Sequence, residues 1–143
     1  MPRVKLTELE NYRFKTEQMI TIAYLNPAGH VGNSQMADLV HDGRIHLLRT
    51  LGLSELNLGD GKTGLIMGDL VINFKTEIFL GEKVLIEADI SEIENKGFRF
   101  FYRISKEGKT AALAETGYVT FSYAERKVCE VPTVFIEKLN SYK

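Results

Sequence analysis

The 143-residue chain contains one cysteine, Cys129, and only three prolines. A single cysteine excludes an intramolecular disulfide framework and a cysteine-rich zinc site, and it fits a reducing compartment. The formal net charge is −1, so no basic field is present to hold a nucleic-acid backbone. No apolar run approaches the roughly 20 residues of a membrane helix, and residues 1–15 lack the apolar core of a secretory signal. We therefore expect a cytoplasmic protein that binds neither nucleic acid nor membrane.

The composition is that of an ordinary folded domain. Hydrophobic residues make up 44% of the chain and charged residues 26%, whereas disordered chains have fewer apolar residues and a larger net charge. The length suits one hydrophobic core and is too short for two. No internal repeat or low-complexity tract divides the sequence. We expect one domain over residues 1–143.

One long helix is predicted over residues 33–51. Apolar residues recur there at steps of three and four, which is the spacing of a helix face: Met36, Leu39, Val40, Gly43, Leu47, Leu48 and Leu51. Asn33 or Ser34 can cap its start, and Gly52 suits its end. The apolar surface is wider than one stripe, so the helix requires cover over much of its circumference.

Strands are predicted before and after this helix. Residues 14–24 are rich in β-formers, and apolar residues alternate in the ranges 69–80, 83–93, 97–105 and 110–124. Short glycine-containing links separate the last four, which favours a four-strand antiparallel meander. The fold class is therefore α+β: a long central helix wrapped by a five-stranded antiparallel β-sheet. Residues 134–141 are expected to form a short terminal helix.

Several common catalytic and cofactor motifs are missing. Gly59–Gly64 has a GxGxxG spacing, but it follows a helix and opens a strand, so we interpret it as a flexible loop, with ligand contact at a pocket mouth as the alternative. The three histidines, His30, His41 and His46, form no HExxH pattern, so no metal is expected. There is no GxSxG motif, and Cys129 has no neighbouring histidine, so covalent serine or cysteine catalysis has no support.

The loop before the long helix is the most informative stretch. Residues 24–33 read Tyr-Leu-Asn-Pro-Ala-Gly-His-Val-Gly-Asn. A helix N-terminus presents free N–H groups, which can polarise a carbonyl and hold the oxyanion of an acyl-transfer reaction. Asn26 and His30 are candidates to orient a ligand or a water there. The alternative is structural: Asn26-Pro27 forms a turn, Gly29 supplies an unusual φ angle and His30 packs.

This stretch resembles the hot-dog thioesterases of the 4-hydroxybenzoyl-CoA thioesterase type and their acyl-CoA and acyl-carrier relatives. Their typical run is Asp-x-Asp-x-x-Gly-His-Val-Asn-Asn, followed by a helix that contains Glu-x-x-Arg. The matching residues are Gly29, His30, Val31, Asn33, Arg44 and the Leu51-Gly52-Leu53 sequence that closes the helix. The resemblance covers about residues 14–132. It implies a hot-dog fold and a substrate-binding role for Gly29, Val31 and Asn33.

The sequence departs from the family at two functional positions. The family's second aspartate, its nucleophile or general base, aligns with Asn26, and the helix glutamate aligns with His41, beside Asp42. An amide cannot take a proton as a carboxylate does. Three interpretations stay open. A water held by Asn26 is activated by His30, His41 or Asp42; hydrolysis has been lost and acyl-thioester binding kept; or Asp38 or Asp42 takes the acid role.

The resemblance implies hydrolysis of an acyl-CoA or acyl-carrier-protein thioester. The alternative from a different class is a non-catalytic module that binds such a thioester. No cofactor is expected beyond the CoA or pantetheine of the substrate itself. The family also implies a homodimer with a continuous sheet, paired again into a homotetramer, with acyl sites at the dimer interface. Four cations are generic candidates for the phosphates of CoA: Lys96, Arg99, Arg103 and Lys109.

Overall fold

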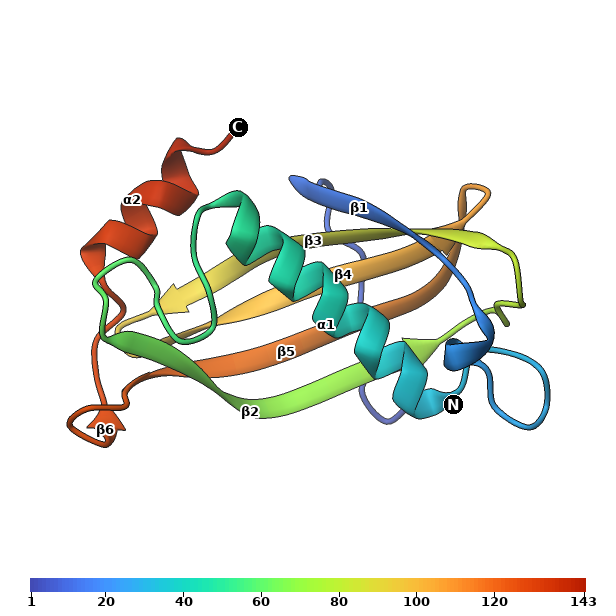
Figure 1. Cartoon of the computed structure of the whole chain (residues 1–143), viewed down its shortest axis with the longest axis horizontal. Helices are drawn as coiled ribbons and strands as arrows, with labels where there is room; N and C mark the ends of the chain where they lie inside the picture. Colours follow the sequence, from blue (N-terminus) through green and yellow to red (C-terminus); the bar gives the residue numbers. More distant parts are fainter.

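The computed structural model describes every residue from Met1 to Lys143 and contains one sheet and two α-helices. In chain order the elements are β1 (Phe14–Met19), a 3-10 helix η1 (Ile22–Tyr24), α1 (Asn33–Thr50), β2 (Thr63–Phe74), β3 (Lys83–Glu94), β4 (Gly97–Lys106), β5 (Lys109–Ser122), β6 (Lys127–Val128) and α2 (Thr133–Ser141). The long helix α1 lies diagonally across one face of the curved sheet (Figure 1). The predicted α+β class, the central helix and the short terminal helix are confirmed.

The order of the strands differs from the predicted meander. The sheet order is β1-β3-β4-β5-β2, all pairs are antiparallel, and the two-residue strand β6 adds to β5. Only β3, β4 and β5 form a meander; the prediction that the strand before residue 81 neighbours β3 is wrong. That strand is β2, which begins at Thr63 and ends at Phe74, and it pairs with β5 at the far edge. A connector, residues 75–82, runs from this edge strand to β3, which lies between β1 and β4.

The connector resembles a strand in sequence because its apolar residues alternate. Instead of continuing the sheet, its backbone bonds to the loop before α1: the Val31 N–H donates to the Ile78 carbonyl at 2.9 Å, and His30 forms an isolated bridge with Phe79. The predicted strand over 14–24 is likewise shorter, since β1 ends at Met19 and residues 22–24 form η1. These differences determine the surroundings of the helix N-terminus.

Helix α1 packs very closely against the sheet. Its buried residues follow the predicted spacing, and Leu39 and Leu47 are completely buried. Gly43 lies on this buried face, where a Cβ atom would come within 2.8 Å of the Ile86 side chain on β3. The absence of a side chain at Gly43 therefore sets how near the helix lies to the sheet. At the far end of α1, Phe135 of α2 stacks on Phe98 of β4 with ring centroids 4.7 Å apart and closes the core.

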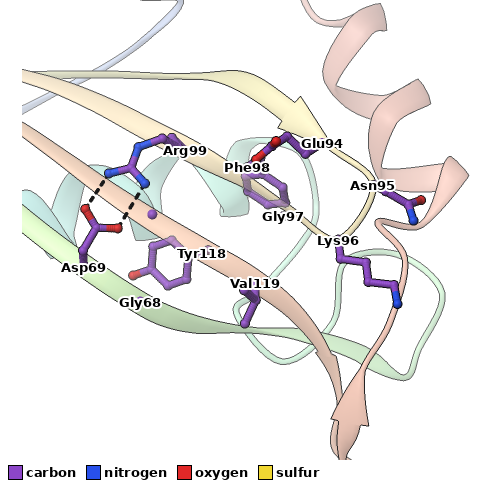
Figure 2. Close-up of a pocket in the computed structure, with 11 residues that line it drawn as sticks. Gly68, Asp69, Glu94, Asn95, Lys96, Gly97, Phe98, Arg99, Tyr118 and Val119 are labelled. Carbon is purple, nitrogen blue, oxygen red and sulfur yellow. Dashed lines mark hydrogen bonds and ion pairs between the residues drawn. The ribbon is translucent and has the colours of Figure 1, made fainter.

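The opposite face of the sheet carries the N-terminal arm, residues 1–13, and a set of ion pairs. The arm is held by Asn73 of β2, whose side-chain oxygen accepts from the Leu6 N–H at 2.7 Å and whose amide donates to the Val4 carbonyl at 2.9 Å. Farther along the sheet, the Arg99 guanidinium spans from Glu115 to Asp69, and Figure 2 shows the paired contact with Asp69. Hydrogen bonds from Arg99 lower the pKa of Asp69, more than burial raises it.

The close approach of α1 predicts that Gly43→Val is destabilising. Added methyl groups would overlap Ile86, and overpacking of a core typically costs about 1–3 kcal/mol. Ala37→Val, on a half-buried position of the same helix, changes helix propensity without this overlap and serves as the control. Urea unfolding of both variants measures the difference. Equal stabilities would show that the helix does not depend on a small residue at this contact.

The Asp69–Arg99 pair predicts a pH-dependent contribution to stability. Because the folded-state pKa of Asp69 is lowered, the contribution is present above the ordinary aspartate pKa of about 3.9 and is lost as the pH falls through the lower folded value. Asp69→Asn should therefore lower the melting temperature at pH 7 and leave it unchanged near the acid limit of folding. Glu137→Gln, an exposed glutamate without an ion pair, is the control. A melting-temperature loss that is independent of pH would contradict this assignment.

Candidate functional site

The loop that precedes α1 is a tight hairpin closed by its own backbone. Leu25 and Val31 face each other in an antiparallel bridge, the Asn26 N–H donates to the His30 carbonyl at 2.9 Å, and the Gly29 N–H donates to the Asn26 carbonyl at 3.0 Å. Gly29 has a φ of +87°, in the left-handed region that glycine adopts without strain. The sequence motif therefore forms a hydrogen-bonded turn that leads directly into α1.

Asn26 shapes this turn with its side chain. Its Oδ1 accepts from the Ala28 N–H at 3.0 Å and from the His30 N–H at 3.4 Å, which is an Asx turn. Its Cβ also lies 3.1 Å from the position that a Cβ on Gly32 would occupy. The carboxamide oxygen is thus engaged with the backbone, as the structural interpretation of Asn26-Pro27 expected.

The N-terminus of α1 opens directly after the hairpin. Gly32 is the N-cap, and no side chain caps the helix. The first intrahelical bond runs from the Met36 N–H to the Gly32 carbonyl at 2.9 Å, so the preceding N–H groups, from Asn33 to Gln35, have no partner within the helix. These donors and the positive end of the helix dipole favour a carbonyl oxygen or an anion at this point.

A cavity of about 250 Å³ lies beside this helix end. Its walls come from the hairpin, from the first turn of α1, from the end of β2 and from the connector: His30, Val31, Asn33, Met36, Phe74, Lys75, Thr76, Glu77 and Ile78. Val31, Met36, Phe74 and Ile78 are apolar, whereas His30, Asn33 and Glu77 are polar. An apolar space bordered by a few polar groups is the usual form of a small-molecule site.

His30 and Glu77 meet in this cavity. The His30 Nδ1 lies 3.1 Å from the Val31 carbonyl oxygen, and its Nε2 lies 3.2 Å from Oε2 of Glu77. Glu77 is not among the site residues predicted from the sequence, because it stands 47 positions after His30 in a segment predicted as strand. Nothing local marked it, since the contact depends on the connector folding back against the hairpin.

His41 lies on the flank of α1 that faces the loop before β2. Its Nε2 is 3.4 Å from Oε1 of Glu55, and the same oxygen accepts from Nε of Arg44 at 2.5 Å. Arg44 is buried and also donates to the Tyr102 hydroxyl at 3.3 Å. Burial raises the pKa of Tyr102, and Arg44 acts in the opposite direction. Glu55 was not among the residues selected from the sequence, because the burial of Arg44, which requires a carboxylate partner, is known only from the fold.

Asp42 lies on the opposite flank of α1. It borders a groove between α1 and β1, together with Glu17 and His46. Burial raises the pKa of the Asp42 carboxyl, as does Asp38, whereas His41 and Tyr24 lower it. Adjacent residues on a helix point about 100° apart, which is why Asp42 and His41 face different neighbours.

The structure therefore brings some of the selected residues together and separates others. Asn26, Gly29 and His30 belong to the hairpin, and Val31 and Asn33 join His30 in the cavity wall. His41 lies eight residues along α1 from Asn33, which is about 12 Å at 1.5 Å per residue. His41 and Asp42 do not line this cavity.

A larger hollow, of about 530 Å³, lies on the outer face of the sheet (Figure 2). Backbone at Gly68, Gly97 and Gly117 forms part of its lining, and Lys96 and Arg99 border it. Arg99 is already bound to Asp69 and Glu115, and Arg103 is bound to Glu87, so neither guanidinium is free for a phosphate. No helix N-terminus is among its lining residues, in contrast to the cavity beside α1.

No group of three histidine, cysteine, aspartate or glutamate residues lies close enough to hold a metal ion. Neither helix is both long and apolar enough to cross a membrane.

Comparison with solved structures identifies the fold. A 1,4-dihydroxy-2-naphthoyl-CoA thioesterase from Synechocystis is similar over 90% of this chain and 96% of its own, with 24% identity and a TM-score of 0.80. A Thermus thermophilus thioesterase solved with coenzyme A and zinc is similar over 94% and 96% of the two chains, with 17% identity and a TM-score of 0.77. The Staphylococcus aureus protein SAV2348, solved with CoA, covers 96% and 87%, with 17% identity and a TM-score of 0.82.

These likenesses establish the hot-dog fold that the sequence resemblance implied. No curated protein matches the sequence significantly. The profile of the thioesterase-like superfamily matches residues 20–139, which include the hairpin, α1, the cavity and all of β2 to β6. The chain therefore belongs to the thioesterase-like superfamily.

Proposed function

We propose that this protein hydrolyses the thioester of an acyl-CoA or of an acyl carrier protein to the free acid and the thiol. The observation that carries the proposal is the cavity at the uncapped N-terminus of α1, where apolar walls adjoin free backbone donors. Coenzyme A is bound in the Thermus and Staphylococcus relatives, which supports CoA as the thiol portion. The free thiol of Cys129 fits the reducing cytoplasm.

In this proposal the acyl group occupies the apolar part of the cavity, beside Met36, Phe74 and Ile78. The thioester carbonyl oxygen then lies at the first turn of α1, where backbone N–H groups polarise it and hold the negative charge that develops when water attacks. Gly29, Val31 and Asn33 position this end of the helix. Loss of one such donor typically costs about 100-fold to 1000-fold in rate in other enzymes.

The proton of the attacking water requires a base close to the cavity, and His30 is the selected histidine that lines it. His41 is a second candidate. It contacts Glu55, whose backbone carbonyl accepts the N–H of Leu65 on β2. Strand β2 is the edge at which, as proposed below, a second copy pairs. Asp42 faces β1, so we give it no step in this reaction.

The competing function is acyl-thioester binding without hydrolysis. It is favoured by one observation: Asn26 holds the place of the family's catalytic aspartate, and its oxygen is engaged with the backbone. Both functions use the same cavity, so they differ in turnover and not in affinity. Assays with a panel of short, long and aromatic acyl-CoAs would identify the acyl group.

The proposal predicts release of free thiol from at least one acyl-CoA of that panel. Asn26→Ala should lower the rate about 10-fold to 100-fold, because the hairpin loses the acceptor that positions His30. Asn26→Asp should preserve or raise it, because a carboxylate can accept the same bonds. His41→Ala, assayed in parallel, tests the second candidate.

Two results would contradict hydrolysis. No thiol release by the wild type, combined with a rise in melting temperature when acyl-CoA is added, would establish a binder. Activity that appears only in Asn26→Asp would identify a thioesterase that has lost its base. Equal rates in all four proteins would remove Asn26 and His41 from the mechanism.

We also propose a homodimer that joins β2 of two copies into one continuous sheet. Strand β2 has a neighbour on one side only, is 12 residues long and exposes Ile66, Met67, Leu70 and Phe74. The other edge strand, β1, has six residues and carries exposed Lys15 and Glu17, which discourage pairing. Because Phe74 lines the cavity, a second copy on β2 would complete the acyl site. A tetramer requires a further contact between two such dimers.

Sedimentation tests the dimer. The wild type should sediment at twice the chain mass at micromolar concentration, and Leu70→Lys should shift it toward the monomer by placing a charge in the interface. Ile93→Lys changes a comparably exposed apolar residue on β3 and should leave the dimer intact. A wild-type monomer at that concentration would count against both the assembly and the shared site.

A further inference from the structure

The hairpin lacks the carboxylate that a water-activating site needs. Asn26 cannot take a proton, and its oxygen accepts from the backbone of Ala28 and His30. The cavity nevertheless contains one carboxylate, that of Glu77. Its side chain is 62% exposed, which leaves its oxygens accessible to water and substrate.

Glu77 is held at the cavity by two segments that are distant in sequence. The connector that carries it is bonded to the hairpin through the Val31 N–H and the Ile78 carbonyl, at 2.9 Å, and through the bridge of His30 with Phe79. These contacts lie at the two residues directly after Glu77, whose Oε2 is 3.2 Å from Nε2 of His30. The carboxylate therefore lies at the end of α1 that provides the backbone donors.

The bonding of His30 determines which of the two side chains can act as a base. Its Nδ1 faces the Val31 carbonyl at 3.1 Å, and a carbonyl oxygen only accepts, so Nδ1 carries a proton. The Nε2 atom lies 3.2 Å from Oε2 of Glu77, and a carboxylate oxygen likewise only accepts. With a proton on each nitrogen, the ring donates to both oxygens. His30 then orients Glu77, and the free lone pairs belong to the carboxylate.

We infer that Glu77 is the general base of the hydrolysis and that His30 is its positioning residue; this inference rests on the proposed function. Glu77 removes a proton from water while the water oxygen bonds to the thioester carbon, and the carbonyl oxygen becomes an oxyanion at the first turn of α1. When the carbon–sulfur bond breaks, the proton held by Glu77 passes to the departing thiolate. The products are the carboxylic acid and the thiol, and Glu77 returns as a carboxylate.

The test compares variants on the acyl-CoA that the wild type cleaves fastest. Glu77→Gln keeps the size of the side chain and removes its basicity, so kcat should fall about 100-fold to 10,000-fold while KM changes little. Glu77→Asp keeps a carboxylate at a shorter reach and should retain an intermediate rate. Glu137→Gln, an exposed glutamate on α2, should match the wild type.

The dependence of kcat on pH separates the two roles. His30 and Lys75 are the other titratable side chains that line the cavity. If Glu77 is the base, the decline of the wild-type rate in acid disappears in Glu77→Gln, whose residual rate rises with hydroxide. The decline persists in His30→Gln. This variant keeps the Glu77 carboxylate and is slower because that carboxylate is no longer held in position.

The possible failures are distinguishable. A wild-type rate in Glu77→Gln would overturn the inference and leave hydrolysis in place. An acid decline that survives in Glu77→Gln and disappears in His30→Gln would make His30 the base and overturn it also. No thiol release by the wild type from any acyl-CoA would overturn the proposed function and this role with it.

Discussion

The close packing of α1 against the sheet is the contact on which the rest of the molecule depends. One helix supplies most of the cover for the concave face of the sheet, and its fully buried leucines each contribute about 1.5–3 kcal/mol through burial. Gly43 lets the helix backbone come near Ile86, so the strands can curve around the helix. With its axis fixed, both ends of α1 have fixed positions: the N-terminus meets the end of β2 and the connector, and the C-terminus meets the loop that leads to β2.

Burial of Arg44 adds an electrostatic requirement to this packing. Removing a guanidinium from water is costly unless it is paired and hydrogen-bonded, and Arg44 meets the condition through Glu55 and Tyr102. Glu55 also accepts the Leu65 N–H through its backbone carbonyl. One residue therefore ties the middle of α1 to the start of β2, the strand with the free edge.

The candidate site lies where the connector between β2 and β3 contacts the hairpin before α1. Because β2 and β3 lie far apart in the sheet, their connector passes the N-terminus of α1 and carries Glu77 with it. A pattern recurs along the helix side of the molecule: His30 faces Glu77, and His41 faces Glu55. In both cases the carboxylate comes from a loop next to β2, so the ends of this strand control the surroundings of both histidines.

The sequence alone determined the elements that depend on the spacing of neighbouring residues. The three- and four-residue spacing of apolar side chains predicted α1 to within one residue, alternation and short turns predicted β3, β4 and β5, and the Gly-His-Val run marked the loop before the helix. The placement of β2 against β5 was decided by tertiary structure, since alternation shows that a strand exists and not which strand it pairs with. The same holds for Glu77 and Glu55, because long-range backbone bonds bring them to their histidines. His41 and Asp42, adjacent in sequence, face different neighbours because only the folded sheet gives the two flanks of a helix different surroundings.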